Sequence, residues 1–423
     1  MNPSLNPLVT SVKESATLAI NLKARALRAQ GRDIAHFGFG QAAFPVPELL
    51  QNAVREHADS NMYLPTQGMI ELREAVSRYY REEFSLDYST EQICVGPGSK
   101  ELIFQTLYLV EGALLVPAPS WVSYGPQATL RGKEVVPIAT SRENSYKLTP
   151  DELDRACYSL GQQQKMLILN NPNNPTGAVY TQNEVDALSE ICRAYQVIVI
   201  SDEIYAGIDF TGKTHASIAK SYPEGTIVSG GLSKLFACGG YRLGVMMFPQ
   251  SLNSLLRAIK AIISETFSCV SAPIQFAGLA AYNEYDKLKP FVERTNDIYK
   301  FASLYLWERF IDMGLNCPKP MGAFYLFPDF DNFKFKLRKH GLFTGLSLSK
   351  KILDEADVAI LPGSDFYFMA THLGARVASV DFDGARVYKA WPERSDNNSH
   401  VVDEFFPNLK KGCDQLEGFL GRL

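Results

Sequence analysis

The chain has 423 residues, of which 46% are hydrophobic and 21% are charged, and its formal net charge is −4 at pH 7. This length predicts more than one domain, and the slightly acidic balance argues against a broad basic surface for nucleic acid. The longest apolar stretches are too short to span a membrane, and seven scattered cysteines without CxxC or zinc-type spacing predict free thiols, no metal site and a cytoplasmic location.

The elements, taken in chain order, predict an α/β fold. An extended arm over 2–8 and a helix near 14–30 begin the chain. Short apolar runs then alternate with amphipathic stretches, which is typical of a mostly parallel sheet with helices on both faces. We expect a large domain over 51–310, with 1–50 and 311–423 contributing to a smaller α+β domain. The predicted strands of the large domain are 93–95, 113–116, 135–138, 166–169, 197–200, 226–229 and 243–248.

Ligands of such sheets bind at the carboxyl ends of the strands, and four segments carry polar residues there. The first is VGPGSKELI (95–103), in which a strand meets Gly96 and Gly98 and a helix begins at Ser99 or Lys100. Free backbone N–H groups and the helix dipole favour a phosphate at this point. Taken alone, an ordinary glycine-rich turn remains the commoner explanation, and the pattern matches neither a P-loop nor GxGxxG.

The second segment, LNNPNNPTG (169–177), follows a strand with two Asn-Pro steps that impose a rigid loop and present the side-chain amide of Asn174. The third, VIVISDEIYAG (197–207), brings Asp202 to the end of an apolar strand, with Tyr205 shortly after it. Burying this carboxylate is costly unless a cation such as a protonated pyridine pairs with it. Considered singly, Asp202 is also explained as a helix N-cap.

The fourth segment, VSGGLSKLFACGGYRLG (228–244), carries Lys234 after a strand and Arg242 eight positions later. A lysine in a pocket can lose its proton and attack a carbonyl group. A solvated loop lysine is the usual alternative, but the small residues around Lys234 and the glycines around Arg242 disfavour it.

Together these segments resemble the class I/II aminotransferases, the aspartate-aminotransferase-like branch of the fold type I pyridoxal-phosphate enzymes. The resemblance covers nearly the whole chain. Further motifs stand in the order of that family: YLPTQGMIELREAV (63–76), PAPSWVSY (117–124), MGAFYLFPDF (321–330) and LPGSDF (361–366).

The resemblance implies a set of cofactor contacts. Lys234 would hold pyridoxal 5′-phosphate through a Schiff base and then move a proton between substrate and cofactor. Asp202 would pair with the pyridine nitrogen, so that the ring accepts electrons. The remaining implied contacts are Tyr205 and Asn174 to the phenolic oxygen, Trp121 stacked on the ring, Ser99, Lys100, Ser233 and Arg242 at the phosphate, and Tyr63 reaching the phosphate of a neighbouring subunit.

The resemblance also implies how the substrate is held. Arg376 matches the arginine that clamps the substrate α-carboxylate, and the backbone of Gly40 lies against the same group. Trp121 and Asn174 are the other implied substrate contacts. Arg386 is a nearby rival for the clamp. The role of Tyr63 implies a homodimer with shared active sites.

The chain departs from the family pattern at several positions. Gly231 stands where many members carry Ser or Thr for the phosphate, and Gln41 and Ala42 replace an acidic-Pro pair. Residues 262–273 contain no arginine of the kind that reads a side-chain carboxylate in animal-type aspartate aminotransferases. Lys100 is an alternative contact for an acidic side chain, although a solvated lysine is common at such a position.

The predicted function is therefore transfer of an amino group between an L-amino acid and a 2-oxo acid by a ping-pong mechanism. A first alternative keeps the cofactor but changes the reaction, as in a C–S lyase, a decarboxylase or an enzyme similar to ACC synthase. A second is a non-catalytic regulatory module that binds the cofactor. The second is disfavoured because the chemical residues are all present and no helix-turn-helix segment precedes residue 30.

Overall fold

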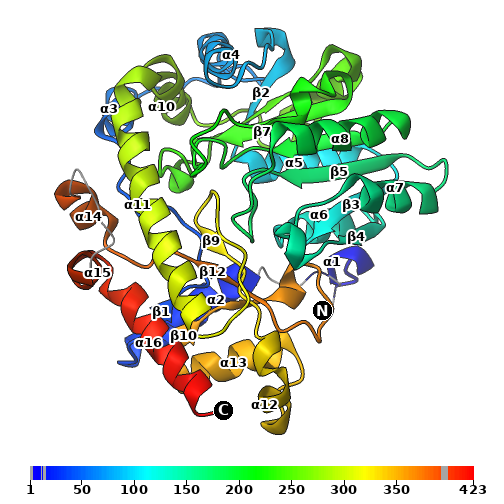
Figure 1. Ribbon diagram of the computed structural model, residues 1–423. Helices are drawn as coiled ribbons and strands as arrows, with labels where there is room; N and C mark the ends of the chain where they lie inside the picture. Colours follow the sequence, from blue (N-terminus) through cyan, green and yellow to red (C-terminus); the bar gives the residue numbers. More distant parts are fainter. Residues whose placement is uncertain (1–2, 11, 13–15, 392–398) are drawn as a thin grey trace.

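A computed structural model describes residues 3–10, 12, 16–391 and 399–423. Its centre is a seven-stranded sheet in the order β2-β8-β7-β6-β5-β3-β4 (Figure 1). Only β8 among these strands runs antiparallel to its neighbours, so the prediction of a mostly parallel sheet is confirmed. The strands are β2 (Ile93–Gly96), β3 (Ala113–Ala118), β4 (Val135–Ala139), β5 (Lys165–Asn170), β6 (Ile198–Asp202), β7 (Thr226–Gly231) and β8 (Gly244–Met247).

Helices cover both faces of this sheet. Successive side chains of a strand point to opposite faces, and β3 shows the consequence. Leu114 and Val116 pack in one buried cluster with helices α5 (Ser99–Leu109) and α9 (Asn253–Glu265). Leu115 packs on the other face with α7 (Pro150–Ser159) and α8 (Gln182–Ala194). Helices α3 (Glu48–Glu56), α4 (Ile70–Phe84), α6 (Tyr124–Leu130) and α10 (Ala272–Asn283) complete this part of the molecule.

Strand β6 ends at Asp202, two residues beyond the end of the strand predicted over 197–200. Asp202 pairs in register with Asn170 of β5 and Ser229 of β7. Pairing with strands on both sides keeps Asp202 within the sheet. The predicted strand stopped at Ile200 because the run of apolar residues ends there.

A second group of elements lies beside the long helix α11 (Tyr285–Asp312). Its antiparallel sheet has the order β11 (Leu361–Pro362), β12 (Ala375–Ala378) and β9 (Tyr325–Leu326). The N-terminal strand β1 (Ala35–His36) pairs in parallel with β10 (Val358–Ala359), so the two ends of the chain share one region. The helices here are α2 (Ala16–Ala29), α12 (Lys334–Lys339), α13 (Gly345–Ala356), α14 (Gly384–Ala390), α15 (Ser399–Phe405) and α16 (Pro407–Gly421), and none of the described helices is long and apolar enough to cross a membrane.

The sequence predicted an extended N-terminal arm over 2–8, but the end of this arm is helical. Residues Pro7–Thr10 form the short helix α1. Pro7 suits the first position of a helix, and the Asn6 side chain accepts a hydrogen bond from the Leu8 backbone at 3.0 Å, as a capping residue does. Residues 2, 14 and 15 of the two predicted N-terminal elements lie outside the described residues.

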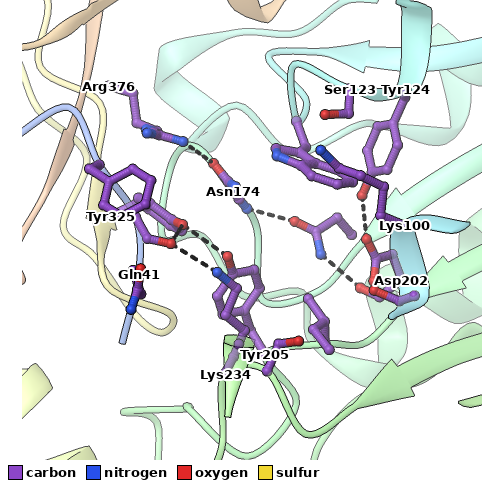
Figure 2. A pocket seen from close by; sticks show the side chains of 18 of the residues that line it. Gln41, Lys100, Ser123, Tyr124, Asn174, Asp202, Tyr205, Lys234, Tyr325 and Arg376 are labelled. Atoms are coloured by element: carbon purple, nitrogen blue, oxygen red, sulfur yellow. Dashed lines mark hydrogen bonds between the residues drawn. The ribbon is translucent and has the colours of Figure 1, made fainter. Parts of the chain in front are cut away.

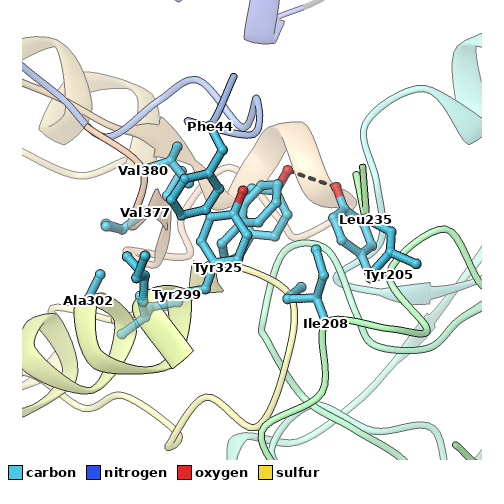
Figure 3. Close-up of a cluster of buried hydrophobic side chains, with 14 of the residues drawn as sticks. Phe44, Tyr205, Ile208, Leu235, Tyr299, Ala302, Tyr325, Val377 and Val380 are labelled. Carbon is cyan, nitrogen blue, oxygen red and sulfur yellow. Dashed lines mark hydrogen bonds between the residues drawn. The ribbon is translucent and has the colours of Figure 1, made fainter. Parts of the chain in front are cut away.

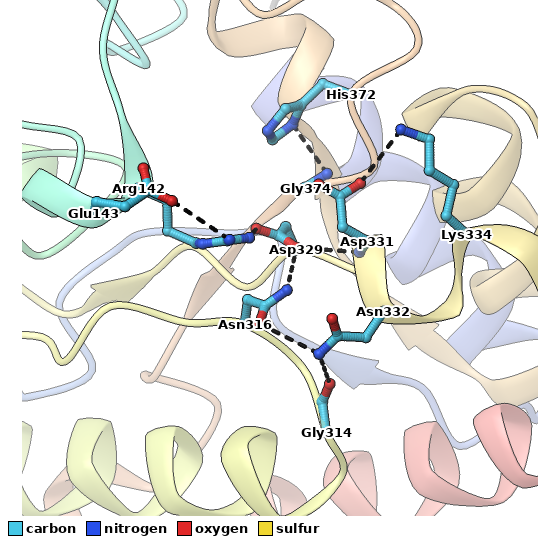
Figure 4. A network of polar contacts seen from close by, with 10 residues as sticks. All are labelled: Arg142, Glu143, Gly314, Asn316, Asp329, Asp331, Asn332, Lys334, His372 and Gly374. Atoms are coloured by element: carbon cyan, nitrogen blue, oxygen red, sulfur yellow. Dashed lines mark hydrogen bonds and ion pairs between the residues drawn. The ribbon is translucent and has the colours of Figure 1, made fainter.

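A polar network joins the main sheet to the second group of elements (Figure 4). Arg142, just after β4, donates to Asp329 at 2.7 Å between Nη1 and Oδ2. The Asp329 side chain is 3% exposed, and its other oxygen accepts from the Asn316 amide at 3.0 Å. A buried carboxylate is tolerated here because a cation and two hydrogen-bond donors, Asn316 and the Asp331 backbone, satisfy it.

Replacing Arg142 with alanine is expected to lower the free energy of unfolding by about 1–3 kcal/mol, because Asp329 stays buried without its cation. Urea denaturation measures this loss. Arg131→Ala is the matched control, since the partner of Arg131, Glu111, is 77% exposed, and exposed pairs contribute about 1 kcal/mol or less. Equal losses in the two variants would contradict the importance of the buried pair.

Candidate active site

The carboxyl ends of the strands open into one cavity of about 410 Å³ (Figure 2). It lies where parallel-sheet proteins bind their ligands. Eleven of the residues singled out from the sequence line it: Gly40, Ser99, Lys100, Trp121, Asn174, Asp202, Tyr205, Ser233, Lys234, Arg242 and Arg376. Tyr63 and Arg386 do not line it, and Tyr63 is 88% exposed.

Lys234 sits in the loop after β7 with its amine inside the cavity. The Nζ atom donates to the backbone oxygen of Gly40 at 2.8 Å. Burial lowers the pKa of Lys234 to about 8, and the positive charges of Arg376 and Arg242 act in the same direction. The neutral, nucleophilic amine therefore forms at a lower pH than in a solvated lysine.

Asp202 ends β6 and is 3% exposed. The hydroxyl of Tyr124 donates to its Oδ2 atom at 2.6 Å, whereas Oδ1 has no hydrogen-bond partner among the described residues. Burial raises the pKa of Asp202 to about 6, and the bond from Tyr124 opposes this rise. A buried carboxylate oxygen without a donor is an open acceptor for a cationic group in the cavity.

The start of α5 and the guanidinium of Arg242 form an anion cradle. Gly98 has φ +90°, and a Cβ atom there would lie 2.2 Å from Nη2 of Arg242. Only glycine therefore allows the loop and the guanidinium to approach this closely. The first N–H groups of α5, at Ser99 and Lys100, have no partner within the helix and point toward the same region as its positive dipole end.

The packing of β7 on β8 explains why position 231 is glycine and not the Ser or Thr that many family members carry. Gly231 pairs with Gly244, and a Cβ atom at Gly231 would lie 2.6 Å from the backbone oxygen of Leu243. A Cβ atom at Gly244 would lie 2.2 Å from the backbone nitrogen of Ser99. A Ser or Thr side chain at position 231 is therefore excluded by the close approach of these strands, and the side-chain hydroxyls near the cradle are those of Ser99 and Ser233.

Tyr205 and Asn174 approach the cavity from two other loops. The hydroxyls of Tyr205 and Tyr325 lie 2.9 Å apart, within an apolar cluster that joins the β6 loop to β9 and α11 (Figure 3). The backbone N–H of Asn174 donates to the Asn170 side chain at 2.7 Å, which holds the loop against the sheet. Trp121 is half-buried, and the Lys100 amine lies 4.9 Å from the centre of its ring.

The two candidate arginines lie in different surroundings. Arg376, on β12, is buried and lines the cavity. Its Nη2 atom donates to the Gly38 backbone at 2.6 Å, its Nη1 atom lies 3.4 Å from the Asn174 amide oxygen, and its Nε atom has no hydrogen-bond partner among the described residues. Arg386 lies on α14, is exposed, and is not among the residues that line the cavity.

Two cavity tyrosines were not assigned a role from the sequence. Tyr124 contacts Asp202, and Tyr325 contacts Tyr205 and, at 3.3 Å, the Gly40 backbone. Both lie in the motifs at 117–124 and 321–330, so the motifs indicated their neighbourhood. Their partners come from distant parts of the chain, and no local pattern reveals such pairs.

Comparison with known proteins identifies the family of this chain. Residues 33–381 match the family model for aminotransferase class I and II. The aspartate aminotransferase of Bacillus subtilis (strain 168) is 32% identical over 367 residues, which cover 85% of this chain and 90% of that protein. The asparagine–oxo-acid transaminase of Streptococcus mutans is 30% identical, with 86% of this chain and 92% of that protein covered.

Among solved structures, the aspartate aminotransferase of Thermus thermophilus with maleate superimposes with a TM-score of 0.84 at 28% identity, covering 98% of this chain and 99% of that one. Sequence and structure thus agree over nearly the full length. The chain belongs to the class I and II aminotransferase family, whose members are pyridoxal-phosphate enzymes, and the prediction of an aminotransferase is confirmed.

Proposed function

We propose that this aminotransferase binds pyridoxal 5′-phosphate in the cavity and moves amino groups between an L-amino acid and a 2-oxo acid by a ping-pong mechanism. The observation that carries the proposal is the pairing of two groups in one cavity. The Lys234 amine and the partnerless Oδ1 atom of Asp202 both line it. They supply a nucleophile for the cofactor carbonyl and an acceptor for its ring N–H.

The other cavity residues fit the cofactor as well. The start of α5, Ser233 and Arg242 suit a phosphate dianion, because helix N-termini and arginine forks bind such groups. The Trp121 ring offers a flat face for the pyridine, and the Tyr205 hydroxyl suits a phenolic oxygen. Bound there, the cofactor would supply a carbonyl group and a protonated ring that accepts electrons from the substrate carbon.

The protein residues perform the proton transfers. With the cofactor bound, Lys234 would take the proton from the substrate α-carbon as a general base and then donate it to the cofactor carbon that carries the amino group. Its lowered pKa suits this task, because a base that titrates near 8 is both available and easily reprotonated. The Asp202 carboxylate would accept the ring N–H of the bound cofactor and so favour the protonated ring nitrogen.

For the substrate, we assign Arg376 to the α-carboxylate, with Gly40 and Asn174 beside it. Arg376 presents a planar guanidinium inside a buried cavity, where a charge-assisted pair is strong. Lys100, at the mouth of the same cavity, is the candidate contact for an acidic side chain. Because relatives of this chain are named aspartate aminotransferases, we propose an acidic amino acid as the first donor to test.

Alanine at position 376 is expected to raise the KM for the amino donor about 10- to 100-fold, since a charged hydrogen-bonded pair contributes about 1.5–3 kcal/mol. Arg386→Ala is the matched control and should leave KM within about twofold. Steady-state kinetics of both variants measure the contrast. A larger effect at position 386 would move the clamp to that residue.

We also propose a cytoplasmic homodimer. The free cysteines are consistent with a reducing compartment. Tyr63 is exposed and outside its own cavity, which suits a contact with the phosphate of a neighbouring subunit. We further propose that 51–310 forms the cofactor domain, with 1–50 and 311–423 forming the smaller one.

A half-reaction tests the proposed chemistry. Enzyme loaded with pyridoxal phosphate and mixed with an amino donor alone should lose its visible absorbance and release one equivalent of 2-oxo acid. A panel of amino acids scored in this way also identifies the donor. Release of a product by elimination or decarboxylation, with the visible absorbance restored, would instead support one of the alternative cofactor reactions.

A further inference from the structure

The carboxylate of Asp202 is held unsymmetrically. Tyr124, the first residue of α6, is fully buried and donates its hydroxyl to Oδ2 at 2.6 Å, as Figure 2 shows. The other oxygen, Oδ1, has no hydrogen-bond partner among the described residues. One oxygen is therefore tied to a neighbouring helix while the other remains available to the cavity.

Few other groups act on this carboxylate. Lys234 faces it across the cavity, and the backbone N–H of Ile204 lowers its pKa. Tyr80 lies behind it, and its pKa is raised mainly by burial. Tyr124 makes the one side-chain hydrogen bond to the carboxylate that the described part of the chain contains.

The adjacent acid, Glu203, raises the pKa of Asp202. Its carboxylate is turned toward a separate buried group, with Oε2 lying 3.1 Å from Nε2 of His215. The hydroxyls of Ser201 and Ser217 donate to its Oε1 atom. The Oε1 atom of Glu203 is thus hydrogen-bonded to these two serines, and no hydrogen bond between described residues joins its side chain to Asp202.

Tyr124 is suited to act as a permanent donor. Burial raises the pKa of its phenol well above 10, and the negative charge of Asp202 adds to the rise, so the hydroxyl keeps its proton. Its ring meets Trp121 edge-on, with centroids 5.3 Å apart. The hydroxyl of Tyr367 donates to the Trp121 backbone and accepts from Gly125, which fixes the turn at the start of α6.

We propose that Tyr124 is a positioning residue that ties down Oδ2 of Asp202, aims Oδ1 at the cofactor ring nitrogen and keeps the carboxylate ionised in its apolar surroundings. The inference rests on the proposed function. Without the Tyr124 hydroxyl, the proton shared by Asp202 and the ring moves toward the carboxyl group, because an unsupported buried anion is unfavourable. The ring then becomes a weaker electron acceptor.

The test is ¹⁵N NMR of the holoenzyme loaded with pyridoxal phosphate labelled at the ring nitrogen. In Tyr124→Phe at pH 7.5, the signal should move from the protonated toward the unprotonated pyridine position. The same variant should lose about 10- to 100-fold in kcat, the contribution of one hydrogen bond to a charged group. Its KM for the amino donor should stay within about threefold, because Arg376 is untouched.

Tyr180→Phe is the matched control, since it removes a buried hydroxyl bonded at 2.7 Å to the Leu148 backbone, away from the cavity. It should lower thermal stability without moving the ¹⁵N signal. If Tyr124→Phe does not fold, 3-fluorotyrosine at position 124 keeps the ring and strengthens the donor. It should hold the signal at the protonated position up to a pH at least as high as in the wild type, and an earlier loss of that signal would count against the role of Tyr124.

If the ¹⁵N signal responds to Asp202→Asn but is unchanged in Tyr124→Phe, the role of Tyr124 is overturned and the proposed function is not. A wild-type protein that binds no pyridoxal phosphate would overturn the proposed function together with it. The two failures are therefore distinguishable.

Discussion

Lys234→Ala is expected to abolish the visible absorbance of the lysine-bound cofactor and to reduce amino transfer by about 10⁴-fold or more. In the proposed mechanism Lys234 is both the nucleophile that holds the cofactor and the base that moves the proton, and positioned proton transfer alone contributes about 10²–10⁴-fold. Absorbance spectra and a coupled assay for the 2-oxo acid measure the two losses.

Lys165→Ala is the control for this experiment. Lys165 is also a buried lysine, but it begins β5, and its amine donates to the backbone oxygens of Gly161 and Gln163. Its loss should affect stability and leave the absorbance intact. Normal absorbance in the Lys234 variant would refute the attachment site.

The pH dependence of attachment follows from the same residue. Because the pKa of Lys234 is lowered to about 8, the neutral amine is the minor form below that value and the major form above it. The rate at which added pyridoxal phosphate becomes attached should therefore rise as the pH increases through about 8 and then level off.

Asp202→Asn is expected to leave the cofactor attached while lowering turnover by about 10²–10³-fold or more, the usual effect of removing one preorganised electrostatic group. Asparagine has nearly the same shape, but it carries no charge to keep the ring nitrogen protonated. Measuring kcat and the amount of attached cofactor in the same preparation shows whether turnover falls while the cofactor stays attached.

Asp381→Asn is the matched control. Asp381 is a largely buried carboxylate that accepts from the His36 backbone at 2.7 Å and pairs with Arg28, outside the cavity. Its variant should lose stability and keep its turnover per folded molecule. Near-normal turnover in the Asp202 variant would show that the ring does not depend on this carboxylate.

Much of the site could be predicted because its residues follow strands. Asn174, Asp202 and Lys234 each come shortly after an apolar run, and the carboxyl ends of parallel strands meet at one edge of a sheet. A one-dimensional pattern therefore indicated a three-dimensional cluster. The same logic placed Ser99 and the start of α5 beside them.

What escaped prediction depends on packing between distant segments. Tyr124 and Tyr325 gain their roles from partners 78 and 120 positions away. The requirement for glycine at position 231 arises from the backbone of β8, which lies against it. The helix over Pro7–Thr10 was missed because a single turn held by local caps has no apolar periodicity.

Attachment of the cofactor to Lys234, on which all the proposed chemistry depends, can be tested by chemical trapping. Enzyme loaded with pyridoxal phosphate would be reduced with borohydride, digested, and its peptides mapped by mass spectrometry. We expect one phosphopyridoxyl group per chain, on the peptide that carries Lys234. Modification of Lys100, which also lines the cavity, or of a lysine outside it, would contradict attachment at Lys234.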